Sequence, residues 1–269
     1  MIRANDVRPS EPTRYGCYVC LRAPVDVRPA AAGCDVLSVA ERLGFVNEFV
    51  TATGHPPAAI AFLRRVDASP GAIEHQGLLL ADAVVHVAAS AEASVRTLCR
   101  EIAGLLPPGI GMSLLGGVAR PANYTGNAMH NFAYAHQVVQ QPGPVMPHAF
   151  VLPTKKTDEW WVKDWMERHT YFLPRYDADG RMVCEGHALA AERGIACLLR
   201  RTYRSPTEPA PSGSFDFVNY FECADTDVPT FFAVCTALRD VKRNPEWKFV
   251  REGPTWRGIR VAAWSELFV

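Results

Sequence analysis

The sequence predicts an α+β protein with a duplicated core. Two stretches show the same order of elements (strand, helix, strand, strand, helix, strand), and a segment rich in Asn, Gln, Gly and Pro separates them. This order is typical of the split βαβ, or ferredoxin-like, unit. One such unit leaves a sheet face open, so two copies can cover each other. We therefore expect an N-terminal half over 1–120, a connector over 121–146 and a C-terminal half over 147–269.

The elements of the first half follow from apolar periodicity and turn residues. A helix is expected over 39–53, because Ser38 and Glu41 have capping-box spacing at its start and Gly54 can end it. The other expected elements are strands over 15–21, 58–66, 78–88 and 111–119, and a helix over 91–105 that carries an apolar stripe.

The second half repeats this order. Pro229 lies in the first turn of a predicted helix over 228–241, a position that proline favours. The remaining predicted elements are strands over 148–153, 194–203, 214–222 and 247–252, and a helix that begins near residue 158.

Charge and composition exclude several classes of partner. The chain has 28 Lys plus Arg and 28 Asp plus Glu, so no net field attracts nucleic acid or an anionic membrane. The sequence contains no apolar run typical of a signal peptide or a membrane span. We expect a soluble, cytoplasmic protein that binds neither nucleic acid nor membranes.

The eight cysteines are scattered, as expected for small buried residues in a reducing compartment. Cys17 and Cys20 form a C-x-x-C pair within a predicted strand. Residues three apart on a strand point to opposite faces, which disfavours a shared zinc or redox role.

A resemblance to a known family appears from Gly117 to Gly258. The motifs that carry it are "GVARPANY" (117–124), "PTKKTDEWW" (153–161), Glu167-Arg168, "DFVNYFE" (216–222) and "KFVREGPTWRG" (248–258). In this order they resemble the chlorite dismutase family of haem proteins. The resemblance implies two ferredoxin-like βαββαβ halves that form a dimeric-type α+β barrel within one chain. It also implies haem b in the C-terminal half and assembly into a homo-oligomer, often a pentamer.

Two histidines compete for the axial position that the resemblance implies. His169, in "MERHT", imitates the family's Met-x-x-His, but the adjacent Glu167-Arg168 already matches the family's Glu-Arg, so His169 falls too early. His187 lies thirteen positions before Arg200 and requires one insertion, "PRYDADGRMVCE" (174–185), with an Asp-Gly turn signal. Surface loops tolerate extra length at small entropic cost. We therefore favour His187 as the iron ligand and keep His169 as the alternative.

An axial imidazole binds iron through one nitrogen when the other donates to a fixed acceptor. The family has a glutamate acceptor in its counterpart of 240–244, where this chain has Arg243. Asp240 and Glu246 are possible substitutes.

The resemblance also nominates the rest of the pocket. Arg200 matches the distal arginine and would hold a small anion, whereas Arg201 would face the other way on a strand. A one-residue error in register would exchange these roles. The residues implied to contact the haem or its propionates are Asn123, Tyr124, Lys156, Trp160 and Trp161.

The activity implied by the resemblance is conversion of chlorite to chloride and dioxygen. One alternative is another oxidative haem reaction, either peroxidase-like or biosynthetic. The other is a non-catalytic haem-binding or assembly barrel. The coproheme decarboxylase branch is disfavoured because its reactive tyrosine is replaced by Leu152.

Overall fold

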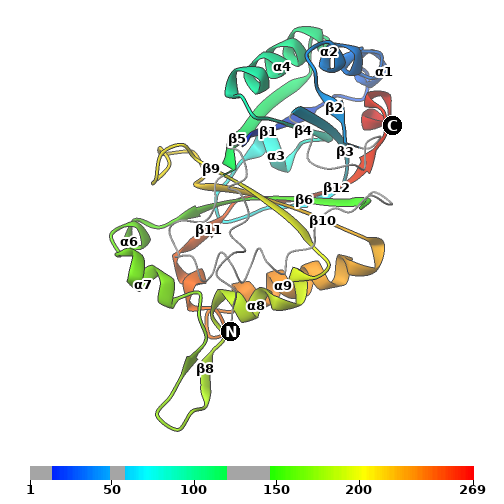
Figure 1. Ribbon diagram of the computed structural model, residues 1–269. Coiled ribbons are helices and arrows are strands. Elements are labelled where there is room, and N and C mark those ends of the chain that lie inside the picture. The colour runs from blue at the N-terminus through cyan, green and yellow to red at the C-terminus, as the bar shows by residue number, and fades with distance from the viewer. Residues whose placement is uncertain (1–13, 49–57, 120–145) are drawn as a thin grey trace, which may run out of the picture.

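The computed structural model describes residues 14–48, 58–119 and 146–269 (Figure 1). The elements before residue 120 are β1 (Arg14–Arg22), α1 (Arg28–Ala32), α2 (Val36–Arg42), β2 (Val46–Asn47), β3 (Ala58–Ser69), α3 (Gln76–Leu79), β4 (Ala83–Ala89), α4 (Glu92–Leu105) and β5 (Gly111–Ala119). Those after residue 145 are β6 (His148–Lys156), α6 (Asp158–Trp161), α7 (Trp165–Thr170), β7 (Arg175–Tyr176), β8 (Met182–Cys184), α8 (Gly186–Ile195), β9 (Leu199–Arg204), β10 (Phe217–Cys223), η2 (Asp225–Asp227), α9 (Val228–Arg239), η3 (Pro245–Phe249), β11 (Val250–Glu252), β12 (Thr255–Val261) and η4 (Trp264–Phe268). Asn123, Tyr124 and nearly all of the predicted connector lie outside the described residues.

Within the described residues, eight strands close into an antiparallel barrel. Their order is β10, β9, β5, β1, β4, β3, β12 and β6, and β6 pairs again with β10. β12 and β11 share one side of β6, because β12 pairs with its first residues and β11 with its last. Closure pairs the strand edges that an open sheet would expose. The predicted α+β class and barrel are confirmed.

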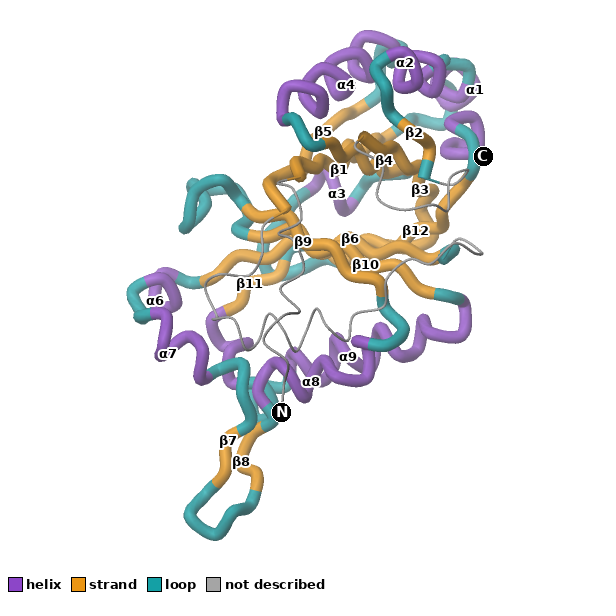
Figure 2. Tube along the Cα trace, in the orientation of Figure 1, coloured by secondary structure: helices purple, strands orange, loops and turns teal. Residues whose placement is uncertain are grey.

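Helices cover the barrel on two opposite sides. α1, α2 and α4 lie over β1, β3, β4 and β5, whereas α8 and α9 lie over β6, β9 and β10 (Figures 1 and 2). Strand alternation assigns the side chains to these layers. Cys17 and Val19 of β1 pack under the N-terminal helices, and Tyr18 and Cys20 point into the barrel. Cys17 and Cys20 thus face opposite ways, as predicted.

The predicted helix over 39–53 is wrong in its bounds. Asp35, rather than Ser38, is the N-cap of α2, and its carboxylate accepts from the backbone N–H of Ser38 at 3.2 Å. The helix ends at Arg42, before Gly44, whose φ of 81° is a conformation that glycine tolerates.

The predicted last strand is divided in the structure. Residues Pro245–Phe249 form a 3₁₀ helix, β11 covers only Val250–Glu252, and β12 is the strand between β3 and β6. Gly253 separates β11 from β12, and its N–H donates to the carbonyl of Pro153 at 2.8 Å. The pairing of β12 with β3 and β6 joins the early and late parts of the chain.

The predicted insertion is a hairpin of β7 and β8 that projects from the body (Figure 1). At its tip the Asp177 carboxylate accepts from the backbone N–H groups of Asp179 at 3.0 Å and Arg181 at 2.9 Å. Within the described ranges, no helix is both long and apolar enough to cross a bilayer.

Candidate functional site

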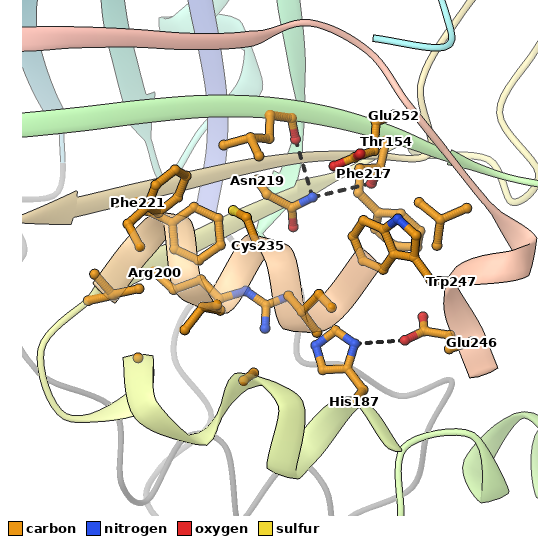
Figure 3. Close-up of a pocket in the computed structure, with 18 of the residues that line it drawn as sticks. Thr154, His187, Arg200, Phe217, Asn219, Phe221, Cys235, Glu246, Trp247 and Glu252 are labelled. Atoms are coloured by element: carbon orange, nitrogen blue, oxygen red, sulfur yellow. Dashed lines mark hydrogen bonds and ion pairs between the residues drawn. The ribbon is translucent and has the colours of Figure 1, made fainter. Parts of the chain in front are cut away.

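A cavity lies between the outer face of β6, β9 and β10 and the helices α8 and α9 (Figure 3). Its walls are mainly apolar, and they include Leu152, Leu198, Phe217, Phe221, Phe231 and Val234. The polar groups that reach it are few: Thr154, Lys156, His187, Arg200, Asn219, Cys235, Glu246 and Glu252. An apolar cavity with a few convergent polar groups is the usual form of a ligand site.

His187 stands in the first turn of α8, in a position that three carbonyl groups fix. The backbone N–H of Gly186 donates to Arg243, that of His187 to Tyr171, and that of Ala188 to Phe172 at 3.0 to 3.2 Å. These bonds satisfy N–H groups that a helix start leaves unpaired. The Nδ1 atom of His187 lies 2.7 Å from Oε2 of Glu246, and Nε2 is on the cavity side of the ring (Figure 3).

Gly186 is required for this helix start. Its φ is 66°, and a Cβ atom would lie 2.5 Å from the carbonyl oxygen of Leu173. We expect Gly186→Ala to lower the free energy of unfolding by about 2 to 4 kcal/mol, because strain and a backbone clash add. Gly180→Ala is the control, since Gly180 has a φ of 76° with open space around it and should lose about 1 kcal/mol. Equal losses in urea unfolding would contradict this account.

Glu246 joins His187 to Lys156. Lys156 Nζ donates to Oε1 of Glu246, and both side chains are almost fully buried. Burial alone would raise the pKa of Glu246, but the Lys156 ammonium and His187 outweigh it and lower that pKa to about 2. An ionised carboxylate therefore accepts the Nδ1 proton, which leaves the Nε2 lone pair free for a metal.

The acceptor that the sequence left open is thus Glu246. Arg243 instead pairs with the Glu185 carboxylate through bonds of 3.0 and 2.8 Å. The Asp240 carboxylate accepts from the backbone N–H groups of Lys242 and Arg243, so it stabilises the turn after α9.

The ionised Glu246 makes stability depend on pH on the acid side. The pKa of Glu246 in the folded protein, about 2, is below the ordinary value of 4.5. Its contribution to the free energy of unfolding is therefore complete above pH 4.5 and is lost as the pH falls through 2. The shift corresponds to about 3 kcal/mol. In urea unfolding, the native protein should lose more stability between about pH 6 and pH 2 than Glu246→Gln, whose amide does not titrate. Parallel curves would contradict this expectation.

Arg200, on β9, also lines the cavity, and its guanidinium extends toward the His187 ring (Figure 3). Its Nε donates to Oγ1 of Thr202 at 3.2 Å, and that hydroxyl donates to the side-chain oxygen of Asn219 at 3.1 Å. The Asn219 amide is in turn bonded to Thr154 and to the Leu152 carbonyl at 3.2 Å. Sequence reasoning missed Thr202 and Asn219, although Asn219 lies inside the "DFVNYFE" motif.

Arg201 points into the barrel, where it donates to both carboxylate oxygens of Glu48 at 3.1 Å. The structure therefore places Arg200, rather than Arg201, at the cavity.

The other predicted site residues lie beside the cavity or away from it. Lys156 reaches it, but its Nζ donates to Glu246 and lies 4.2 Å from the Trp160 ring centroid, a contact that differs from the propionate role the resemblance implied. Trp160 is fully buried, and Trp161 partly so; neither lines the cavity. Their indole N–H groups are buried and find no acceptor among the described residues, so a further polar group would be stabilised there. His169 is partly buried on α7, outside the cavity lining.

The residues present fit a haem. The site offers one imidazole nitrogen toward an apolar cavity, with the second nitrogen bonded to a carboxylate, which is the donor set of a haem held by one histidine. Among the described residues no group of three or more His, Cys, Asp or Glu is arranged to hold a bare metal ion.

Comparison with known proteins identifies the fold. No family model and no curated protein matches the chain. Among solved structures, the chlorite dismutase of Candidatus Nitrospira defluvii in complex with imidazole is 20% identical, with a TM-score of 0.64 over 95% of this chain and 93% of that one. A tryptophan-to-phenylalanine variant of that enzyme, in complex with cyanide, gives the same values. TA0507, a candidate chlorite dismutase, is 12% identical, with a TM-score of 0.60 over 96% of this chain and all of that one. The likeness spans both parts of the chain, which therefore has the fold of the chlorite dismutases.

Proposed function

We propose that the chain is a haem b enzyme that converts chlorite to chloride and dioxygen. The observation that carries this proposal is an apolar cavity lined both by the hydrogen-bonded set His187, Glu246 and Lys156 and by Arg200. When bound, haem supplies the iron and the redox chemistry. The chain itself would ligate the iron and would bind and position the anion.

Each polar residue has a distinct task in this proposal. His187 would ligate the iron through Nε2, Glu246 would hold the Nδ1 proton, and Lys156 would keep Glu246 ionised. The planar guanidinium of Arg200 matches the geometry of an oxyanion, so it would bind chlorite and retain the anion that chlorite forms. The Thr202 and Asn219 side chains orient the Arg200 guanidinium toward the cavity.

An absorption spectrum and an oxygen electrode test this proposal. The protein reconstituted with haem should show a ferric haem spectrum and should release oxygen from chlorite. A haem spectrum without oxygen release, but with oxidation of a phenolic dye by peroxide, would replace the proposal with the peroxidase-like reaction. The ionised Glu246 favours that alternative, because a carboxylate partner makes the imidazole a stronger electron donor. A haem that is inert to both oxidants would indicate the non-catalytic barrel.

We also propose that the protein is a cytoplasmic homo-oligomer. Large apolar side chains are exposed on α7 and on the hairpin: Trp165, Met166, Tyr176, Met182 and Val183. A two-stranded hairpin is only marginally stable in water by itself, so contact with another copy would stabilise it. Light scattering should give a multiple of the chain mass of 29.6 kDa. A monomer would contradict this proposal.

A further inference from the structure

A second cluster of reactive side chains lies inside the barrel. Tyr18, His86, Tyr203 and Tyr220 come from four strands, are almost fully buried and do not line the cavity. The His86 ring stacks on Tyr18 at a centroid distance of 4.9 Å and on Tyr220 at 5.6 Å, and lies 5.7 Å from the Tyr203 ring. Apolar side chains alone would fill a barrel core. The buried hydroxyl and imidazole groups of these four rings therefore need a separate explanation.

Tyr203 and His86 form a buried proton donor and acceptor. The Tyr203 hydroxyl lies 2.9 Å from Nε2 of His86. Burial raises the pKa of Tyr203 to about 12 and lowers the pKa of His86, so at neutral pH a protonated phenol faces a neutral imidazole. This assigns the hydrogen bond as Tyr203 donating to His86, with the ring proton on Nδ1.

Glu48 places a negative charge beside the same imidazole. Its Oε2 lies 3.9 Å from Nδ1 of His86. Burial would raise the pKa of Glu48, but Arg201, His86 and Arg260 together outweigh it and hold that pKa well below its usual range. The carboxylate is therefore ionised and would stabilise an imidazolium at His86.

The position of the Tyr203 ring depends on Gly16. A Cβ atom at Gly16 would lie 2.1 Å from Cζ of Tyr203, so only glycine leaves room for this ring. The Tyr18 hydroxyl, by contrast, is buried and has no hydrogen-bond partner among the described residues. Of these two phenols only Tyr203 has a base in reach.

The cluster lies directly behind the cavity wall. On β9, Arg200 faces the cavity and Arg201 the barrel, and Thr202 and Tyr203 repeat this alternation. Asn219 and Phe221 line the cavity on β10, whereas Tyr220 points inward. One layer of sheet separates the two sites.

We propose that Tyr203 and His86 form a proton-coupled redox site that donates an electron to the haem iron of the cavity after a peroxide has oxidised that iron. The Tyr203 O–H bond breaks, its proton forms an N–H bond with Nε2 of His86, and its electron reduces the iron by one equivalent. The products are a neutral tyrosyl radical at Tyr203 and an imidazolium that Glu48 stabilises. This inference rests on the proposed function, because the haem supplies the oxidant.

Electron paramagnetic resonance after rapid freezing tests the inference. Haem-loaded protein mixed with one equivalent of hydrogen peroxide should give a tyrosyl radical signal, and Tyr203→Phe should lose it. Tyr18→Phe is the matched control, because Tyr18 is equally buried but has no base, and it should keep the signal. His86→Gln, whose amide is not a base, should also lose the signal while the haem spectrum stays unchanged.

A second measurement requires no variant. In D₂O the radical of the native protein should couple to one exchangeable deuteron, the one transferred to His86. A signal that persists in Tyr203→Phe, an absent signal in haem-loaded native protein, or a radical without that coupling would each overturn the inference alone. Failure to take up haem would instead overturn the proposed function, and the inference with it.

Discussion

His187→Ala is expected to abolish stable haem binding. Nε2 of this side chain is the imidazole nitrogen that the described residues present to the cavity, and an alanine leaves the apolar walls with no iron ligand. It also leaves Lys156 as the remaining partner of Glu246 among the described residues. Titration of the purified variant with ferric haem should show no ferric histidine-ligated spectrum.

His169→Ala is the matched control for this experiment. His169 lies on α7, outside the cavity lining, so its loss should leave the haem spectrum and affinity unchanged. If His169→Ala lost the spectrum and His187→Ala kept it, the ligand assignment would be wrong.

Arg200→Ala should lower the rate of oxygen release from chlorite by about 10² to 10³, a range typical for the loss of one charged or hydrogen-bonding group that stabilises a reacting anion. The haem spectrum should stay unchanged, because the substitution leaves His187 and its bond to Glu246 in place. Arg200→Lys should retain part of the rate, since it keeps the charge but loses the planar fork of donors.

Arg193→Ala is the control for loss of positive charge near the site. Arg193 is exposed on α8 and does not line the cavity, so the rate from the oxygen electrode should not change. If Arg200→Ala released oxygen as fast as the native protein, Arg200 would not be the group that binds the anion.

The fold was predictable where side-chain periodicity and turn residues agree. The alternation in β1 separates Cys17 from Cys20, and the same rule separates Arg200 from Arg201. The last strand was misplaced because the residues before Gly253 are as apolar as a strand, although Pro245 starts a 3₁₀ helix.

The residues that line the cavity were easier to place from the sequence on regular elements than in the loop that follows α9. Counting residues against the family placed Arg243 at the acceptor position, whereas the turn that Asp240 organises brings Glu246 to His187. Loops change length and course without loss of stability, so register along the sequence does not fix which of their side chains reaches a site. The role of Thr202 depends on its distance to Arg200, which no sequence pattern states.

The late position of β12 has a consequence for the order of folding. This strand lies between β3 and β6, and Glu246, which completes the histidine pair, precedes it by only a few residues. A growing chain therefore makes most of both helical layers before it can close the ring or bring Glu246 to His187. Contacts between residues so distant in sequence form slowly, because a long loop must close first. Barrel closure and completion of the His187–Glu246 pair are thus expected to arise in one late step, and a nascent chain that lacks this segment should expose the cavity walls to chaperones.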